Sequence, residues 1–283
     1  MIPRALIDVD SRDLYLDLLN GCLSRSLFGE RYKGLFQPRV SHGWRRMWWN
    51  GLYPQVRSLL AGVGLELVRT ARFDPELCRI GSYYHGDAES MIGLTGLENV
   101  QQCVVDCLQR GVPGDLMECG VWRGGTTILM RAILQLYGDT ERKVWVADSF
   151  EGCPKPREEA EAGDKHWENN FIAVPLEQVR KNFARYGMLD DRVVFLKGWF
   201  SDTLPKAPIG RLAVLRIDAD MYSSTMDVLN VLYRKVAPSG YVIIDDYYTI
   251  AICRQAVDEF RSANGITEPI VAVDQCRAFW RVR

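Results

Sequence analysis

Apolar strands alternate with helical segments from Pro113 to the end of the chain, and no other feature of the sequence restricts the fold as strongly. Short runs rich in β-branched residues predict strands, and apolar residues three or four positions apart predict the helices between them. Strands that alternate with helices form a mostly parallel sheet with helices on both faces. The expected strands are 115–120, 143–148, 192–197, 212–218, 240–245, 270–274 and 277–282, and the expected helices are 125–137, 175–187, 224–236 and 251–264.

The last two expected strands depart from the parallel pattern. Only Asp274, Gln275 and Cys276 separate them, which is too short for a crossover helix, so they must pair antiparallel as a hairpin. A parallel sheet that ends in such a hairpin is the layout of Rossmann-like methyltransferases rather than of nicotinamide-dependent dehydrogenases. We therefore expect an α/β fold of the Rossmann-like class I methyltransferase type, with a mostly parallel seven-stranded sheet.

The residues before this alternation predict a helical N-terminal extension. Apolar spacing indicates helices at about 12–25, 52–70 and 95–110. Between the first two, Trp44, Trp48 and Trp49 lie among arginines, which favours a short amphipathic helix or a contact between subunits. We expect two domains, a helical extension over 1–110 and a catalytic domain over 111–283, assembled as a homodimer or higher homo-oligomer.

The bulk composition narrows the class of protein. The 283 residues carry a net charge of −1 without a broad basic surplus, which argues against a nucleic-acid partner. The eight cysteines are scattered and form no Cys-x-x-Cys pair, so neither zinc nor a disulfide framework is expected. The sequence predicts no signal peptide and no apolar run of membrane-spanning length. The expectation is a cytoplasmic enzyme without a membrane partner.

Two acidic clusters follow two of the expected strands. Asp218 and Asp220 end one strand, and Asp245 and Asp246 end another. In an open α/β sheet, ligands bind outside the carboxyl ends of the strands. Four carboxylates there repel one another unless a cation or a proton lies between them, and Mg²⁺ prefers such oxygen ligands. Asp245 and Asp246 can share one ion only if the strand ends there and the backbone turns. The alternative is a pair of solvated strand ends.

A glycine turn follows the first strand of the alternating region. Glu118 ends the strand, Gly120 follows it, and Gly124 and Gly125 precede a helix. The spacing is not Gly-x-Gly-x-x-Gly, so a pyrophosphate site is weakly supported. A carboxylate at this position suits a cationic amino-acid group, and S-adenosylmethionine (SAM) carries an ammonium and a sulfonium without phosphate. The alternative is an ordinary turn with a salt-bridged glutamate.

The next two strand ends suggest contacts to the rest of a nucleoside. Asp148, followed by Ser149, can accept hydrogen bonds from both ribose hydroxyls, a feature that sites for NAD share. Gly198 lets the backbone approach an adenine edge, and Trp199 or Phe200 can lie against its face. For either aromatic residue, a place in the core is the alternative.

In several segments the chain resembles the macrocin O-methyltransferase family, which includes macrolide-sugar O-methyltransferases and the noviose O-methyltransferase of aminocoumarin synthesis. The segments are Leu14–Leu19, Phe28–Glu30, Glu118–Gly125, Asp148–Gly152, Val174–Phe183, Lys197–Pro205, Asp218–Thr225, Asp245–Tyr247 and Ala256–Arg261. Residues 36–80 match the family least. The resemblance implies a SAM- and Mg²⁺-dependent methylation of a hydroxyl, often on a deoxysugar of a natural product.

The resemblance also implies roles for single residues. Asp218, Asp245 and Asp246 are implied as the metal ligands, and Asp220 as the general base. Other residues are implied to bind the cofactor, with Met91 in a segment that closes over SAM from the N-terminal side. The expected cofactor-binding residues are Met91, Glu118, Gly120, Asp148, Ser149, Gly198, Trp199, Phe200 and Asp218.

These expectations give a leading hypothesis and three alternatives. The leading hypothesis is an O-methyltransferase acting on a small natural product, in which Asp220 removes the proton from a hydroxyl. The alternatives are the same fold acting on a catechol or phenol, a SAM-binding protein without activity, and a nicotinamide-dependent oxidoreductase. His85 and His166 lie in loops that we expect to border the site, and the polar loop 155–170 is predicted to be mobile and to act as a lid.

Overall fold

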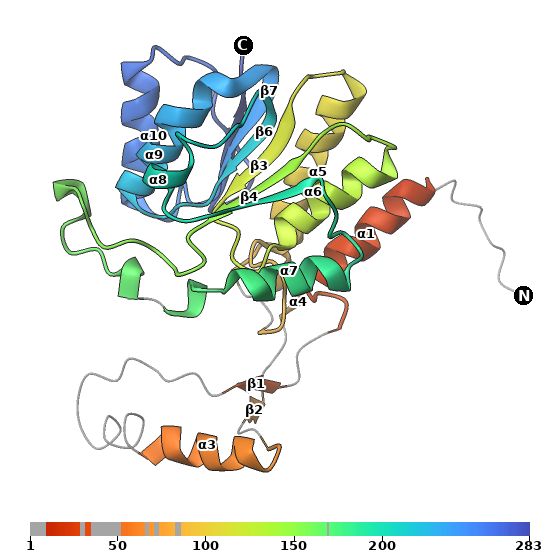
Figure 1. Cartoon of the computed structure of the whole chain (residues 1–283), viewed down its shortest axis with the longest axis vertical. Coiled ribbons are helices and arrows are strands. Elements are labelled where there is room, and N and C mark those ends of the chain that lie inside the picture. The colour runs from red at the N-terminus through yellow and green to blue at the C-terminus, as the bar shows by residue number, and fades with distance from the viewer. Residues whose placement is uncertain are drawn as a thin grey trace, which may run out of the picture.

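A seven-stranded sheet forms the centre of the molecule (Figure 1). The computed structural model describes residues 10–28, 32–34, 52–65, 68–70, 74–82, 86–168 and 170–283. The strand order is β5-β4-β3-β6-β7-β9-β8. The strands are β3 (Asp115–Cys119), β4 (Val144–Asp148), β5 (Val193–Lys197), β6 (Leu212–Ile217), β7 (Val236–Ile244), β8 (Val271–Ala272) and β9 (Ala278–Arg281).

The direction of the strands confirms the predicted sheet. From β5 to β7 all neighbouring strands pair parallel. β9 pairs antiparallel with both β7 and β8, so the last two strands form the expected hairpin. β9 lies between β7 and β8 in the sheet, although it follows both in the chain.

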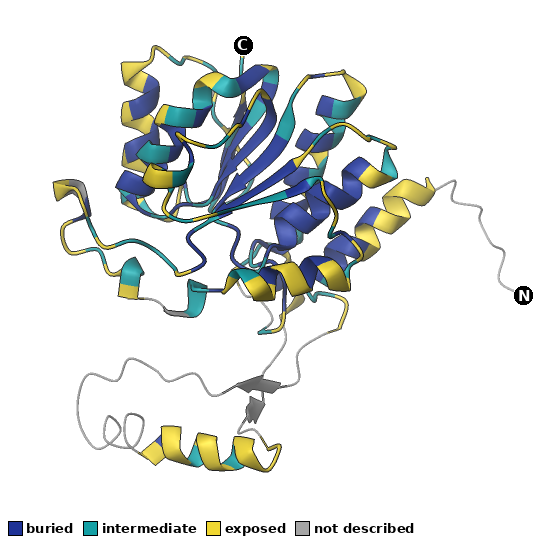
Figure 2. Ribbon diagram, in the orientation of Figure 1, coloured by how far each residue is buried: buried dark blue, intermediate teal, exposed yellow. Residues whose placement is uncertain are grey.

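Helices cover both faces of the sheet (Figure 1). One face carries α1 (Ser11–Leu23), α5 (Gly93–Gln109), α6 (Gly125–Leu136) and α7 (Leu176–Arg185), and the other α8 (Phe200–Thr203), α9 (Tyr222–Leu232) and α10 (Ala251–Ala263). Successive strand residues face opposite layers: Leu116 packs in the first core and Met117 in the second. The inner strands β3, β4 and β6 are therefore buried on both faces (Figure 2), which explains their continuous apolar runs.

Most predicted helices agree with the structure within a few residues, but the expected helix over 52–70 is too long. α3 spans Tyr53–Gly62, and Gly64 follows it with a φ of 74°. Residues Val68–Thr70 form β2, which pairs antiparallel with β1 (Tyr32–Gly34). Gly64 ends the helix because a residue in the left-handed conformation cannot continue it.

The boundary between the expected helix 224–236 and the expected strand 240–245 also differs. α9 ends at Leu232, a 3-10 turn follows over Tyr233–Lys235, and β7 begins at Val236. The pairing of β6 with β7 shifts register between Leu212 and Val214. Residues 237–239 lie between the two expected elements, but in the structure they are part of β7.

Several N-terminal predictions are not decided by the structure. Trp44, Trp48, Trp49 and His85 lie outside the described residues. The division into domains at residue 110 and the homo-oligomeric state stay predictions. None of the described helices, which include the short α4 (Pro75–Arg79), has the length and apolar content that a membrane-spanning helix requires.

Candidate functional site

A cavity of about 560 Å³ lies at the carboxyl ends of β3, β4, β6 and β7. Its wall also includes the segment before α5 and part of the loop after β4. Every residue that the sequence singled out for the cofactor, the metal or the proton transfer lines this cavity: Met91, Glu118, Gly120, Asp148, Ser149, Gly198, Trp199, Phe200, Asp218, Asp220, Asp245 and Asp246. The four strand ends thus meet where the topology predicts a ligand site.

Gly120 brings the ends of β3 and β6 into contact. Its φ is 87°, and a Cβ atom built there would lie 1.7 Å from the carbonyl oxygen of Asp218. The N–H of Gly120 donates to the carbonyl of Ala147 (2.9 Å), and the N–H of Asp218 donates to that of Cys119 (2.8 Å). Only glycine fits here, because a side chain would push Asp218 away from the turn.

Glu118 is a buried carboxylate with one unused oxygen. The residue is 1% exposed, and its Oε1 accepts a hydrogen bond from Arg216. Its Oε2 is buried without a hydrogen-bond partner among the described residues. Burial raises the pKa of Glu118 to about 7, although Arg216 acts in the opposite direction. A buried acceptor without a donor, at the cavity wall, suits an entering ammonium group.

Asp148 is held against the glycine turn at the end of β4. Its Oδ2 accepts from the N–H of Val121 (2.8 Å), and its Oδ1 from the N–H of Phe150 (2.7 Å). Burial raises the pKa of Asp148, and these backbone donors partly offset that effect. Each carboxylate oxygen can accept a second hydrogen bond, so the residue can still receive ribose hydroxyls.

The remaining predicted cofactor contacts also face the cavity. Gly198 has a φ of 137°, and the following Trp199 is 37% exposed, so this ring is not a core residue. Phe200, the first residue of α8, and Met91 are half-buried. Their contacts to a cofactor stay a prediction.

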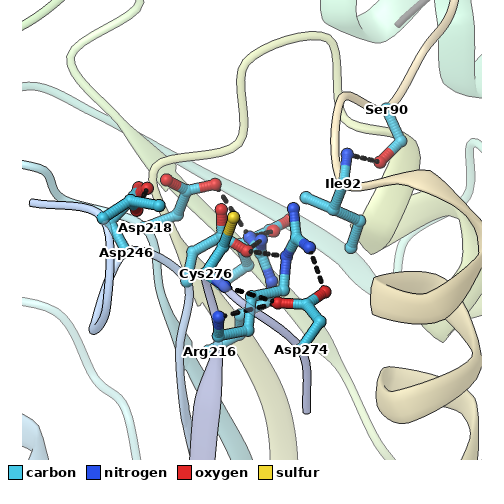
Figure 3. A network of polar contacts seen from close by, with 11 residues as sticks. Ser90, Ile92, Arg216, Asp218, Asp246, Asp274 and Cys276 are labelled. Carbon is cyan, nitrogen blue, oxygen red and sulfur yellow. Dashed lines mark hydrogen bonds and ion pairs between the residues drawn. The ribbon is translucent and has the colours of Figure 1, made fainter. Parts of the chain in front are cut away.

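Three carboxylates gather at the ends of β6 and β7. Asp218, Asp220 and Asp246 each offer one oxygen, and these oxygens lie within 4.8 Å of one another. Figure 3 shows Asp218 and Asp246 next to each other. We call these three residues the acid cluster. A set of carboxylate oxygens is the donor type that Mg²⁺ prefers, so the residues present fit this ion.

Asp245 is placed differently from its predicted role. β7 ends at Ile244, and Asp245 is 7% exposed. Its Oδ1 accepts hydrogen bonds from Arg216 and from Nε of Arg277 (2.8 Å). Burial acts to raise the pKa of Asp245, but the two arginines hold it below its usual value. The structure therefore groups Asp220, rather than Asp245, with Asp218 and Asp246; both arginines use the same oxygen of Asp245.

Burial and mutual repulsion raise the pKa values of the three carboxylates in the acid cluster. Burial and the nearby Asp218 carboxylate raise the pKa of Asp220 to about 6. Burial, Asp245 and Asp220 raise the pKa of Asp246 to about 8. Burial and neighbouring acids raise the pKa of Asp218 as well. This mutual repulsion favours protons or a cation between the carboxylates.

Arg216 and Arg277 are functional residues that sequence reasoning missed. Arg216 is 1% exposed and contacts Glu118, Asp245 and Asp218, the last at 3.0 Å (Figure 3). It thereby joins the predicted cofactor contact on β3 to the acids on β6 and β7. A signal was present, because Arg216 interrupts the apolar strand Leu212–Ile217, and a buried arginine needs acidic partners.

The described part of the loop after β4 contains short helices that its polar composition does not predict. It forms three short 3-10 helices: η2 (Glu159–Glu161), η3 (His166–Glu168) and η4 (Asn170–Ile172). Nδ1 of His166 lies 2.9 Å from the Asp164 carboxylate, and His166 is not part of the cavity wall formed by the described residues. Cys153, near the start of the loop, lies with its Sγ 3.6 Å from Oδ2 of Asp220.

Comparisons with known proteins show the family of the chain. The model of the family described as Macrocin-O-methyltransferase (TylF) matches residues 12–282. A protein of Streptomyces olivaceus, named 8-demethyl-8-(2,3-dimethoxy-alpha-L-rhamnosyl)-tetracenomycin-C 4'-O-methyltransferase, is 54% identical over 212 residues, which cover 74% of this chain and 80% of that protein. The demethyldecarbamoylnovobiocin O-methyltransferase of Streptomyces niveus is 48% identical over 217 residues, covering 75% and 83%.

A solved structure has the same fold. The O-methyltransferase NovP superposes with a TM-score of 0.80 and 38% sequence identity, covering 96% of this chain and 99% of that chain. This similarity confirms the expected class I methyltransferase fold, with its mostly parallel sheet and antiparallel C-terminal strands.

Proposed function

Because the chain belongs to the macrocin-O-methyltransferase family, we propose that it methylates a sugar hydroxyl of a glycosylated natural product, with Mg²⁺ bound at the acid cluster. The chain is a SAM-dependent O-methyltransferase. The observation that carries the proposal is the position of the acid cluster and the unused oxygen of Glu118 on the wall of one cavity. A methyl donor and an acceptor hydroxyl could thus be held side by side.

The relatives support a sugar as the acceptor. The Streptomyces olivaceus protein is named for a rhamnosyl group and for methylation at its 4' oxygen. A sugar hydroxyl is a weak nucleophile, because its pKa is close to that of water. Three carboxylates at the acceptor end of the cavity suit a substrate whose hydroxyl must lose a proton.

On the cofactor side, the chain binds SAM and orients it. SAM, when bound, supplies a methyl group on a sulfonium that leaves as a neutral thioether. We assign Glu118 to the ammonium of its amino-acid part and Asp148, with Ser149, to the ribose hydroxyls. We assign Trp199 and Phe200, which line the same cavity, to the adenine. Holding the donor and the acceptor together accounts for much of the rate in a reaction of this kind.

On the acceptor side, the chain holds charge and moves a proton. Asp218 and Asp246 would hold the cation. Asp245, the third ligand that the resemblance implies, lines the same cavity, but Arg216 and Arg277 hold its Oδ1. A divalent cation held by these residues would make a sugar hydroxyl beside it more acidic. Asp220 would then take the proton at a carboxylate oxygen. Its pKa of about 6 lies near neutral pH, where a base is both ionised and effective.

An acceptor panel tests the function. Purified chain is incubated with SAM, Mg²⁺ and demethylated glycosides of the tetracenomycin and novobiocin types, beside a catechol, and products are identified by mass spectrometry and NMR. We expect a methyl group on a sugar oxygen, and we expect EDTA to stop turnover and added Mg²⁺ to restore it. Methylation of the catechol alone would replace the proposed acceptor class, and full turnover in EDTA would remove the ion from the proposal.

The stability of the metal-free protein should fall as the pH rises. Folding raises the pKa of Asp246 from 3.8 to about 8, so the folded state binds more protons than the unfolded state between these values. Stability is then highest at low pH within this window and is lost as the pH rises through it. Mg²⁺ replaces the protons, so its stabilising effect should be larger at the upper end.

Thermal unfolding with and without Mg²⁺, across this pH range, measures the effect. The Asp246→Asn variant is the control, because it should flatten both the pH dependence and the response to Mg²⁺. A gain in Tm with Mg²⁺ that is equal at both ends of the range would contradict the assignment.

A further inference from the structure

One carboxylate of the loop after β4 is buried, although its neighbours are exposed. Glu161 is 0% exposed, whereas Glu158 and Glu159 lie at the surface. Burying a carboxylate without partners is costly, so such a group is retained where several donors converge on it. The burial of Glu161 therefore indicates that several donors hold this residue in place within a polar loop.

The two oxygens of Glu161 hold two different segments. Oε1 accepts from the N–H of Ser223 and from its hydroxyl, both at 2.7 Å. Oε2 accepts from the N–H of Arg157 (2.6 Å) and from that of Glu158 (3.2 Å). Burial acts to raise the pKa of Glu161, but these donors hold it below its usual value. The carboxylate thus ties the start of the loop to the first turn of α9.

That first turn directly follows the proposed base. Asp220 has a φ of 55° and is separated from Ser223 by only two residues. A non-glycine residue in this conformation is held by its surroundings, and a fixed helix start is such a constraint. Glu161 therefore helps to set where the Asp220 carboxylate lies, without contact to it.

Other contacts join the same two segments. Nη2 of Arg157 lies 2.5 Å from the Asp227 carboxylate on α9, and its Nε donates to the Ser223 hydroxyl (3.3 Å). Cys153 contacts Asp220. Cys153, Arg157 and the intervening Lys155 also line the cavity, so a bound acceptor would touch the loop that Glu161 anchors.

We propose that Glu161 is a positioning residue that couples this acceptor-facing loop to Asp220. The inference rests on the proposed function for the identity of the base. An acceptor that contacts the loop would then be aligned with the carboxylate that takes its proton. Loss of this tie should misplace Asp220, while Glu118 and Asp148, at the ends of β3 and β4, should keep their positions.

The variant Glu161→Gln tests the coupling. Glutamine offers one carbonyl oxygen, so it can serve either Ser223 or the loop amides but not both. With the panel glycoside that the wild type methylates, we expect kcat to fall on the order of 10²-fold, because small misplacements of catalytic groups have effects of this size. SAM affinity, measured by calorimetry, should stay unchanged. Glu159→Gln, in the same 3-10 helix but exposed, is the matched control.

Hydrogen–deuterium exchange gives a second measurement that needs no acceptor. In Glu161→Gln, the amides of residues 155–168 and those of 219–224 should exchange faster together, while β3 and β4 stay protected. Ser223→Ala, which removes one donor and keeps the N–H, should show a smaller change in the same direction. If the amides of 219–224 in Glu161→Gln exchange as slowly as in the wild type, or if the kcat of this variant is unchanged, the coupling is overturned. If the wild type methylates no panel glycoside, the proposed acceptor fails, and the exchange data still decide the coupling.

Discussion

Replacing Asp220 with asparagine is expected to lower the rate of methyl transfer by about 10³-fold, within the range that general bases contribute. Asparagine keeps the shape of the side chain but cannot accept the proton. SAM affinity should not change, because Asp220 is not among the residues assigned to the cofactor, which include Glu118, Asp148 and Trp199. Single-turnover kinetics with a panel glycoside, and calorimetry with SAM, measure the two effects separately.

Calorimetry with Mg²⁺ distinguishes the two roles open to Asp220. If Asp220 acts as the base, as the resemblance implies, Asp220→Asn should bind Mg²⁺ with nearly wild-type affinity. If Asp220 is a metal ligand, as its place in the acid cluster allows, both the Mg²⁺ affinity and the turnover of Asp220→Asn should fall. Asp202→Asn, on the exposed surface of α8, serves as the matched control. Turnover of Asp220→Asn close to that of the wild type would exclude both roles.

Replacing Arg216 with methionine is expected to lower the free energy of unfolding by about 3–5 kcal/mol, the usual effect of breaking a buried ion pair from one side. Arg216 is 1% exposed and contacts Glu118, Asp218 and Asp245. Methionine fills much of the volume but leaves these carboxylates without their shared counter-charge. Urea denaturation followed by circular dichroism measures the loss.

A surface pair provides the comparison for Arg216. Arg254 and Asp258 form an ion pair one turn apart on α10, with about half of each side chain exposed. Arg254→Met should change stability by no more than about 0.5 kcal/mol, because solvent screens such pairs. Equal effects of the two substitutions would show that the buried network contributes little beyond a surface contact.

The sequence predicted the sheet and the location of the site because both follow from local patterns. Apolar runs and their spacing identify parallel strands, and the topology of such sheets gathers strand ends at one edge. The acids at the ends of β3, β4, β6 and β7 therefore line one cavity, at the edge that the topology predicts.

The partners of single acids could not be predicted in the same way. Asp245 and Asp246 are adjacent and chemically identical, so the sequence does not distinguish them. Arg216 and Arg277 form ion pairs with Asp245 because the tertiary fold brings them to that carboxylate. Glu161 is one of several acids in a polar loop, and its burial depends on where α9 begins. The helix expected over 52–70 is too long for a local reason, because Gly64 adopts a left-handed conformation that ends it.

The tie between Glu161 and Ser223 has a consequence for enzyme engineering. Exchanging the loop after β4 between relatives is an obvious route to new regioselectivity, because loops tolerate replacement better than strands. Here the loop and the first turn of α9 share one carboxylate, although Glu161 and Ser223 are 62 residues apart in the chain. A chimera that transplants the loop alone would separate a matched pair, so the unit to exchange is the loop together with the start of α9.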